Sequence, residues 1–150
     1  MRSSMIYRAV SFLVLFSFLG DDIASATCTD TVVPTPVTWP AGHFFTSAAA
    51  ISPQDVWIVG RVSYGTVAEH WNGSQWAVYP TPSPNIDQGV VSTLNGVSAA
   101  SSDDVWAVGV TGQSALIEHW NGSDWTVVPS PSIGTSSQLV SISATASSNV

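Results

Sequence analysis

Two Glu-His pairs, Glu69-His70 and Glu118-His119, are the residues of this 150-residue chain whose types could do acid–base or metal chemistry. A carboxylate beside an imidazole can act as a general acid and base, and both groups are ligands of zinc. Adjacent residues on a β-strand point to opposite faces, so neither pair can act on one ligand without a bulge. We therefore interpret both pairs as hydrogen-bonding residues within hairpins or between repeats, and we predict no catalytic residue, metal site or cofactor.

The two pairs belong to a sequence repeat with a period of 49 residues. Without gaps, residues 49–84 match residues 98–133 at 18 of 36 positions. Two motifs recur: DVWxVG at 55–60 and 104–109, and EHWNGSxW at 69–76 and 118–125. A third copy begins where residues 139–150 align with 94–105 at an offset of 45. The chain thus holds about two and a half copies, which indicates either a fragment of a longer periodic protein or a chain that assembles with others.

Each copy has the pattern of four β-strands. In the second copy the predicted strands are 94–99, 105–110, 116–120 and 125–128. They are short runs rich in Val, Ile and Trp, separated by Gly, Ser, Asp or Pro, and none shows the spacing of a helix. Asn121-Gly122 predicts a tight type I′ hairpin between the third and fourth strands. The Pro-rich stretch after the fourth strand cannot pair as a central strand, so it must carry the chain to the next copy.

A four-stranded antiparallel unit of this length has the size of a β-propeller blade, since such blades contain about 40 to 50 residues. The middle strands are nearly continuous apolar runs, such as VWAVGV at 105–110, as expected for a sheet that is covered on both faces. We therefore expect an all-β fold, a β-propeller of four-stranded antiparallel blades with about 2.5 blades present. A β-sandwich is the alternative, but a sandwich gives no reason to reuse one hairpin sequence.

The sequence DVWAVG, followed by EHWNGxxW and a VPxPS exit, resembles the repeats of secreted bacterial β-propellers, which are loosely akin to kelch and sialidase-type propellers. The resemblance covers residues 44–150 and implies a propeller fold outside the cytoplasm. It implies no activity, because Trp71 and Trp120 stand where the sialidase Asp-box has its Asp. The paired glycines of kelch blades are also absent.

The amino terminus has the pattern of an export signal. Arg2 and Arg8 precede an apolar run at 9–19, and Ala24-Ser25-Ala26 supplies the small residues that signal peptidase requires. We expect cleavage after residue 26 and a secreted or cell-surface location. The apolar run has 11 residues, whereas a helix that crosses a bilayer needs about 20. An uncleaved membrane anchor is therefore the alternative.

Cys28 is the only cysteine of the chain and cannot close an internal disulfide. A lipidated Cys28 is a further alternative for the amino terminus, although Ser25 and Thr27 do not fit a lipobox. The predicted organisation is a signal peptide at 1–26, a linker with a possible closing strand at 27–43, blades at 44–92 and 93–137, and the start of another blade at 138–150.

The charge of the chain excludes one class of partner. Three Arg and no Lys against ten acidic residues give a net charge of −7, and Arg61 is the only cation after residue 26. Nucleic-acid binding requires clustered positive charge, so it is excluded. We expect a glycan or an extracellular protein as the partner, with additional blades or self-assembly to close the ring.

Residues that break the repeat are the candidates for ligand binding. Arg61, Tyr64, Asn85 and Asp87 lie in the connections that would open on one face of a propeller, and the second copy has no equivalent of them. Arg61 could hold a carboxylate or a phosphate bidentately. The residues that keep the repeat are predicted to be structural: Asp55, Trp57, His70, Trp71, Trp76, Asp104, Trp106, His119, Trp120 and Trp125.

These patterns favour an extracytoplasmic propeller module that binds or scaffolds a glycan or protein partner without catalysis. The alternative is a fragment of a propeller enzyme of sialidase, lyase or oxidase type, with its active site on other blades. After residue 26 the sequence has one Arg, three His and one Cys, which are too few for the Arg cluster or metal set that such enzymes use.

Overall fold

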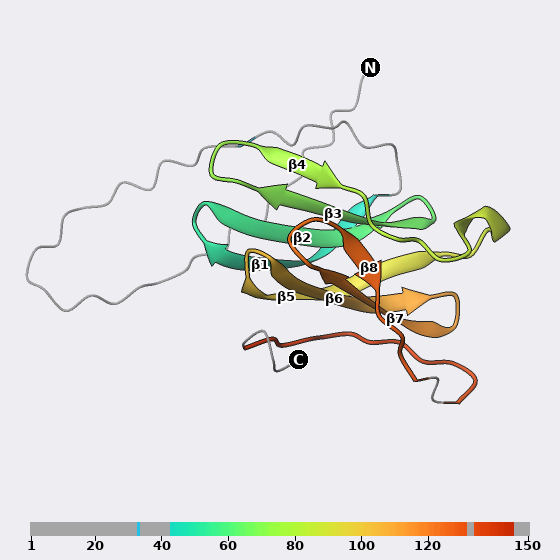
Figure 1. Ribbon diagram of the computed structural model, residues 1–150. Helices are drawn as coiled ribbons and strands as arrows, with labels where there is room; N and C mark the ends of the chain where they lie inside the picture. Colours follow the sequence, from blue (N-terminus) through green and yellow to red (C-terminus); the bar gives the residue numbers. More distant parts are fainter. Residues whose placement is uncertain (1–32, 34–42, 132–133, 146–150) are drawn as a thin grey trace, which may run out of the picture. The chain divides into compact units, whose positions relative to one another are not determined.

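The computed structural model of the protein describes residue 33, residues 43–131 and residues 134–145 (Figure 1). The predicted signal peptide at 1–26 and most of the predicted linker at 27–43 lie outside the described residues. Within the described ranges, eight strands form two four-stranded antiparallel sheets, and helical structure is limited to one short 3₁₀ turn. The predicted all-β class is therefore confirmed.

Each sheet consists of four consecutive strands in chain order. The first sheet contains β1 (Phe44–Ser52), β2 (Asp55–Val62), β3 (Gly65–Trp71) and β4 (Trp76–Tyr79). The 3₁₀ turn η1 (Ile86–Gln88) lies on the link to the second sheet. The second sheet contains β5 (Ser92–Ser101), β6 (Asp104–Thr111), β7 (Ser114–Trp120) and β8 (Trp125–Val127). The two copies of the repeat thus correspond to the two sheets, each with the four antiparallel strands that the sequence predicts.

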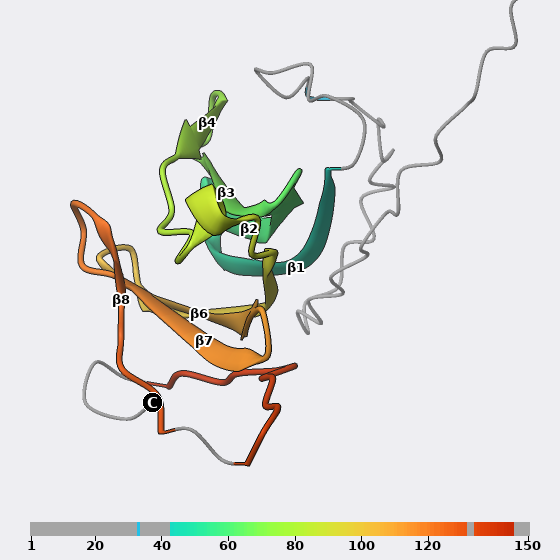
Figure 2. The same ribbon diagram turned by 90° about the vertical axis from the view of Figure 1, so that its right-hand side faces the viewer.

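The hydrophobic core lies between the two sheets. Strand β5 contacts β1, β2 and β3, and Figure 2 shows the second sheet beside the first. The buried residues of this core are Trp57, Val59, Ala68, Leu94, Val97, Val105, Ala107, Leu116, Trp120 and Trp125. Both copies contribute to one core, so neither sheet buries its apolar face alone.

The two sheets meet through faces that are not equivalent in the repeat. The first sheet presents Trp57, whose ring centroid lies 5.1 Å from that of Trp120 and 5.4 Å from that of Trp125. The counterparts of these two residues, Trp71 and Trp76, pair in register with each other on the opposite face of the first sheet from Trp57. The interface is therefore head to tail, unlike a sandwich in which equivalent faces meet.

The chain leaves both sheets along the same path. The Ser92 amide donates to the Tyr64 carbonyl at 2.8 Å, and the Ser137 amide donates to the Gln113 carbonyl at 2.9 Å. Tyr64 and Gln113 are equivalent at the period of 49, and Ser92 and Ser137 at the offset of 45. A second contact repeats in the same way, with the Leu94 carbonyl bonded to Thr46 and the Leu139 carbonyl bonded to Asn95. Residues 137–139 thus follow the second sheet as the start of β5 follows the first.

The last glycine of the DVWxVG motif is required by a close approach of two strands. A Cβ atom on Gly109 would lie 1.9 Å from the Thr93 carbonyl oxygen, and one on Gly60 would lie 2.1 Å from the Phe44 carbonyl oxygen. Both sites lie beside a shift in strand register, between Leu94 and Gly96 in the second sheet. A β-bulge there brings the backbones together, so only a residue without a side chain fits.

Replacing Gly109 with alanine is expected to lower the free energy of unfolding by about 2 to 3 kcal/mol, because the added methyl group overlaps a backbone atom that cannot rotate away. Urea unfolding followed by Trp fluorescence measures this loss. Gly134→Ala is the control, since it has φ of +76° and no atom within 4 Å of an added Cβ, and only backbone strain of about 1 kcal/mol is expected. Equal losses in both variants would contradict the steric explanation.

The loop between β7 and β8 in the second sheet differs from the predicted turn. Trp120 pairs with Trp125, which leaves a four-residue loop at 121–124. The Asn121 Oδ1 atom accepts hydrogen bonds from the amides of Ser123 and Asp124, both at 3.0 Å. Gly122 has φ of +91° while Asn121 does not have positive φ, so the predicted type I′ hairpin is wrong. The Asn121 side chain accepts the hydrogen bonds that hold the turn, so the Asn121 backbone does not have to adopt the left-handed conformation of a type I′ turn.

Candidate functional site

Each copy builds the same cluster of one Asp, one His and one Trp. In the first sheet the Nε2 atom of His70 lies 2.8 Å from Oδ1 of Asp55, and the His70 ring stacks on Trp57 with centroids 4.4 Å apart. Strand register places Trp57 opposite His70 and so on the same face. The second sheet repeats these contacts with Asp104, Trp106 and His119. Asp55 and Asp104, which the sequence predicts to be structural, thus each hold an imidazole.

The hydroxyl of Ser102 joins the first cluster from the other sheet. Ser102 lies in the turn between β5 and β6 and donates to Oδ2 of Asp55, the carboxylate that also holds His70. In a nucleophilic triad the hydroxyl must instead lie on the imidazole, which takes its proton. The hydrogen bond from Ser102 to Asp55 therefore links the two sheets. It does not activate the serine, because the hydroxyl contacts the carboxylate and not the imidazole.

The glutamates of the two Glu-His pairs lie on the opposite face from their histidines. Glu118 pairs with Ala107 and Val127 in strand register, whereas His119 pairs with Trp106. Both Glu69 and Glu118 are fully buried. The separation rules out joint action of Glu118 and His119 on one ligand.

Burial raises the pKa of Glu118 to about 8, and the hydroxyl of Thr66 on β3 opposes this shift. The Thr66 hydroxyl donates to the Pro82 carbonyl at 2.8 Å and contacts the Thr81 hydroxyl at 2.9 Å. Neither carboxyl oxygen of Glu118 has a hydrogen-bond partner among the described residues. Desolvation therefore dominates, and the carboxyl is protonated at neutral pH.

Three of the four predicted ligand-binding residues lie at one end of the first sheet (Figure 1). Tyr64 is 58% exposed in the β2–β3 turn, and its carbonyl accepts a hydrogen bond from the amide of Ser92, the first residue of β5. Asn85, with φ of 58°, is the N-cap residue before η1, and Asp87 lies within η1. The guanidinium of Arg61 instead lies 4.7 Å over the ring of Phe44, a cation–π contact. The two segments lie close together, because a Cβ atom on Gly65 would lie 3.1 Å from Cδ1 of Ile86. None of the four predicted residues lines the groove described next.

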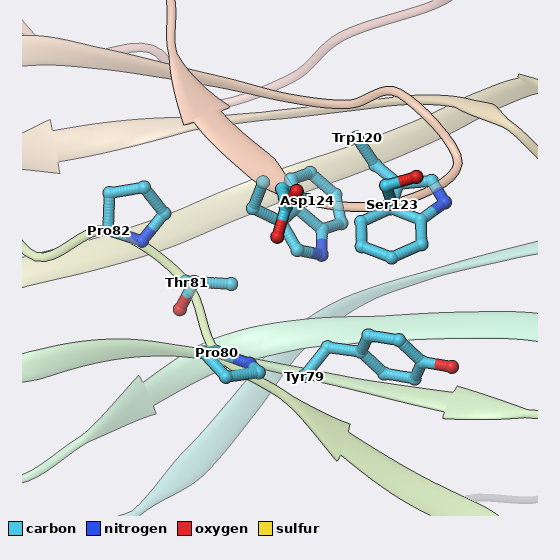
Figure 3. A pocket seen from close by; sticks show the side chains of 8 residues that line it. Tyr79, Pro80, Thr81, Pro82, Trp120, Ser123 and Asp124 are labelled. Atoms are coloured by element: carbon cyan, nitrogen blue, oxygen red, sulfur yellow. The ribbon is translucent and has the colours of Figure 1, made fainter.

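The described residues do form an open groove at the outer edge of the junction between the sheets (Figure 3). It has a volume of about 300 Å³. One wall comes from the end of β4 and the other from the β7–β8 hairpin. The lining residues are Tyr79, Pro80, Thr81, Pro82, Trp120, Ser123, Asp124 and Trp125. Apolar rings thus lie beside a carboxylate and hydroxyls in one concave surface, a combination typical of ligand sites.

Sequence reasoning did not find this groove. Trp120 and Trp125 were predicted to be structural, and the other six lining residues were not selected. The available signal was the difference between copies, because Tyr79 and Asp124 stand opposite Val128 and Gln75 in the repeat. This difference alone does not reveal the groove, because the sequence does not show that the end of β4 lies beside the β7–β8 hairpin of the other sheet.

The structure shows neither a metal cluster nor a membrane-spanning helix within residues 43–131 and 134–145. No three His, Cys, Asp or Glu residues there are placed to hold a metal ion. No helix in that part of the chain has the length and apolar character needed to cross a membrane. The chain was also compared with known proteins, and neither a family model nor a curated protein matches its sequence.

Proposed function

We propose that this chain is part of a β-propeller outside the cytoplasm and that it binds a glycan or protein partner without catalysing a reaction. The head-to-tail contact of Trp57 with Trp120 and Trp125 supports the propeller. Such a heterologous contact generates a ring when the rotation between units closes. The four-stranded meander of each sheet matches the form of a blade.

The ring requires more than the two sheets described. The outward face of the second sheet carries the stacked Trp106 and His119 rings, which are the counterparts of the Trp57 and His70 rings that the second sheet covers. A further sheet of the same type fits this face by the same contacts. Additional blades or assembly with other copies supply it in this proposal, and the N-terminal sequence supports export.

The role in binding rests on one observation, the groove at the junction of the sheets. The groups that could do acid–base chemistry are engaged elsewhere. His70 is held by Asp55 and stacked on Trp57, and Glu118 is enclosed in the core. What remains accessible is a concave surface with apolar walls and a polar rim, which suits recognition better than reaction.

The proposal is tested on the exported protein by electron microscopy and by glycan and peptide arrays. We expect ring-shaped particles with blades around an axis, and retention of at least one array ligand that is released unchanged. Particles in which the two sheets form an isolated sandwich would overturn the propeller. Turnover of a retained ligand, or retention of none, would overturn the binding role.

A further inference from the structure

We propose that the groove between the end of β4 and the β7–β8 hairpin binds a neutral saccharide. This inference rests on the proposed binding function and names its site and ligand class. A saccharide ring presents apolar C–H faces together with hydroxyl groups, so its site needs apolar surface and hydrogen-bonding groups side by side. The groove provides both within about 300 Å³, a volume at the lower end of small-ligand sites.

The apolar surface of the groove is rigid. Trp120 and Trp125 are 6% and 5% exposed and form its floor, held by the ring of Trp57. Tyr79 packs edge-on against Trp120 with ring centroids 5.1 Å apart. Since these rings are fixed by the core, a ligand meets a preformed surface and loses little binding energy to ordering the protein.

The polar rim of the groove is positioned by the hairpin loop. The Asn121 side chain fixes the amides of Ser123 and Asp124, and both of their side chains remain exposed. Figure 3 shows Ser123 and Asp124 on one side of the groove, opposite Pro80, Thr81 and Pro82. A carboxylate accepts hydrogen bonds from the hydroxyls of a sugar, and such charge-assisted bonds are stronger than neutral ones.

The charge of the groove selects against acidic ligands. Asp124 is the only charged residue that lines it. Arg61 is the only Lys or Arg among the described residues, and its guanidinium lies on Phe44. A sialylated, uronic or phosphorylated glycan would place its negative charge near Asp124 without a cation to bind it. A neutral saccharide avoids this repulsion.

Two residues of the groove differ between the copies and can be exchanged for the residues of the other copy. Pro80 and Pro82 have counterparts of the same type at Pro129 and Pro131, as Trp120 and Trp125 have at Trp71 and Trp76. Tyr79 and Asp124 instead correspond to Val128 and Gln75. The same blade pattern occurs with Val and Gln at these positions, so Tyr79→Val and Asp124→Gln replace each residue with one that the repeat already accommodates.

The experiment measures saccharide binding by the exported protein and these two variants. Arrays of neutral and sialylated glycans identify the ligand, and titration calorimetry with the best neutral oligosaccharide gives its affinity. We expect each variant to weaken binding at least tenfold, because Tyr79→Val removes a ring that lines the groove and Asp124→Gln removes its one carboxylate. Tyr64→Gln, which also substitutes the residue of the other copy, is the matched control and should retain the affinity, because Tyr64 does not line the groove.

The outcomes separate this inference from the proposed function. Loss of affinity in Tyr79→Val and Asp124→Gln with retention in Tyr64→Gln supports the groove. The reverse pattern places the ligand on the loop surface and overturns the groove, although the binding function stands. Retention of only peptides, or of only sialylated glycans, also overturns the neutral saccharide while leaving a binding module. Unfolding curves that match wild type exclude misfolding as the cause of a loss.

Discussion

Replacing Glu118 with glutamine is expected to remove the loss of stability that ionisation of this carboxyl causes between about pH 4.5 and 8. The carboxyl is fully buried between the sheets and its pKa is raised from an ordinary value near 4.5 to about 8. Between these values the folded protein keeps the proton and the unfolded chain releases it. The free energy of unfolding therefore falls as the pH rises through this window, by about 1.4 kcal/mol per unit.

The total loss across the window is on the order of 5 kcal/mol, and it is complete once the pH exceeds the folded-state pKa. Glutamine has nearly the same shape and cannot ionise, so Glu118→Gln should resemble wild type at pH 5 and be more stable at pH 8.5. Urea unfolding at several pH values measures both curves. All other ionisable residues are the same in the two proteins, so the difference between the curves isolates Glu118. Parallel curves would contradict a buried, protonated carboxyl.

Replacing Trp57 with alanine is expected to lower the free energy of unfolding by about 4 kcal/mol, the range for a buried aromatic side chain. Trp57 is 1% exposed, and its ring contacts those of His70, Tyr79, Trp120 and Trp125. The substitution therefore leaves a cavity at the contact between the two sheets. Urea unfolding followed by circular dichroism measures the loss, because this variant alters the fluorescence of the remaining tryptophans.

Trp106→Ala is the matched control for Trp57→Ala. Trp106 is the repeat counterpart of Trp57, stacks on His119 in the same way and is only partly buried. It lies on the face of the second sheet that points away from the first, so we expect less than half the loss. Trp57→Phe should cost less than Trp57→Ala, because it keeps an aromatic ring and removes an indole N–H that has no acceptor among the described residues. Equal losses in the two alanine variants would mean that the sheets do not stabilise each other.

The fold class and the strands could be predicted from the sequence because the same strand and turn pattern occurs in both copies of the repeat. Short apolar runs separated by Gly, Ser and Asp predicted four strands in each copy, and all eight are present. The propeller itself remains a proposal, since ring closure depends on sheets outside the described residues. The I′ turn at Asn121 was wrong, because the dipeptide rule counts backbone preference and omits the side-chain hydrogen bonds to Ser123 and Asp124.

The candidate site could not be predicted to the same extent. The Asp55–His70 contact joins residues 15 apart, and only the register of β2 and β3 reveals that they meet. The groove forms because the end of β4 lies beside the β7–β8 hairpin of the other sheet. No local sequence pattern predicts that these two segments are close in space. Gly109 shows the opposite case: its recurrence was visible in the motif, but the carbonyl that excludes a side chain belongs to another strand.

The non-equivalent faces of the two sheets give the array a direction. A unit added after the second sheet meets the Trp106 and His119 face, and a unit added before the first sheet meets the Trp71 and Trp76 face. In the proposed propeller, each new unit therefore brings the surface that the next one requires. If the proposal holds, in-frame duplication or loss of one 49-residue stretch of the gene changes the number of units while the junction between them stays the same.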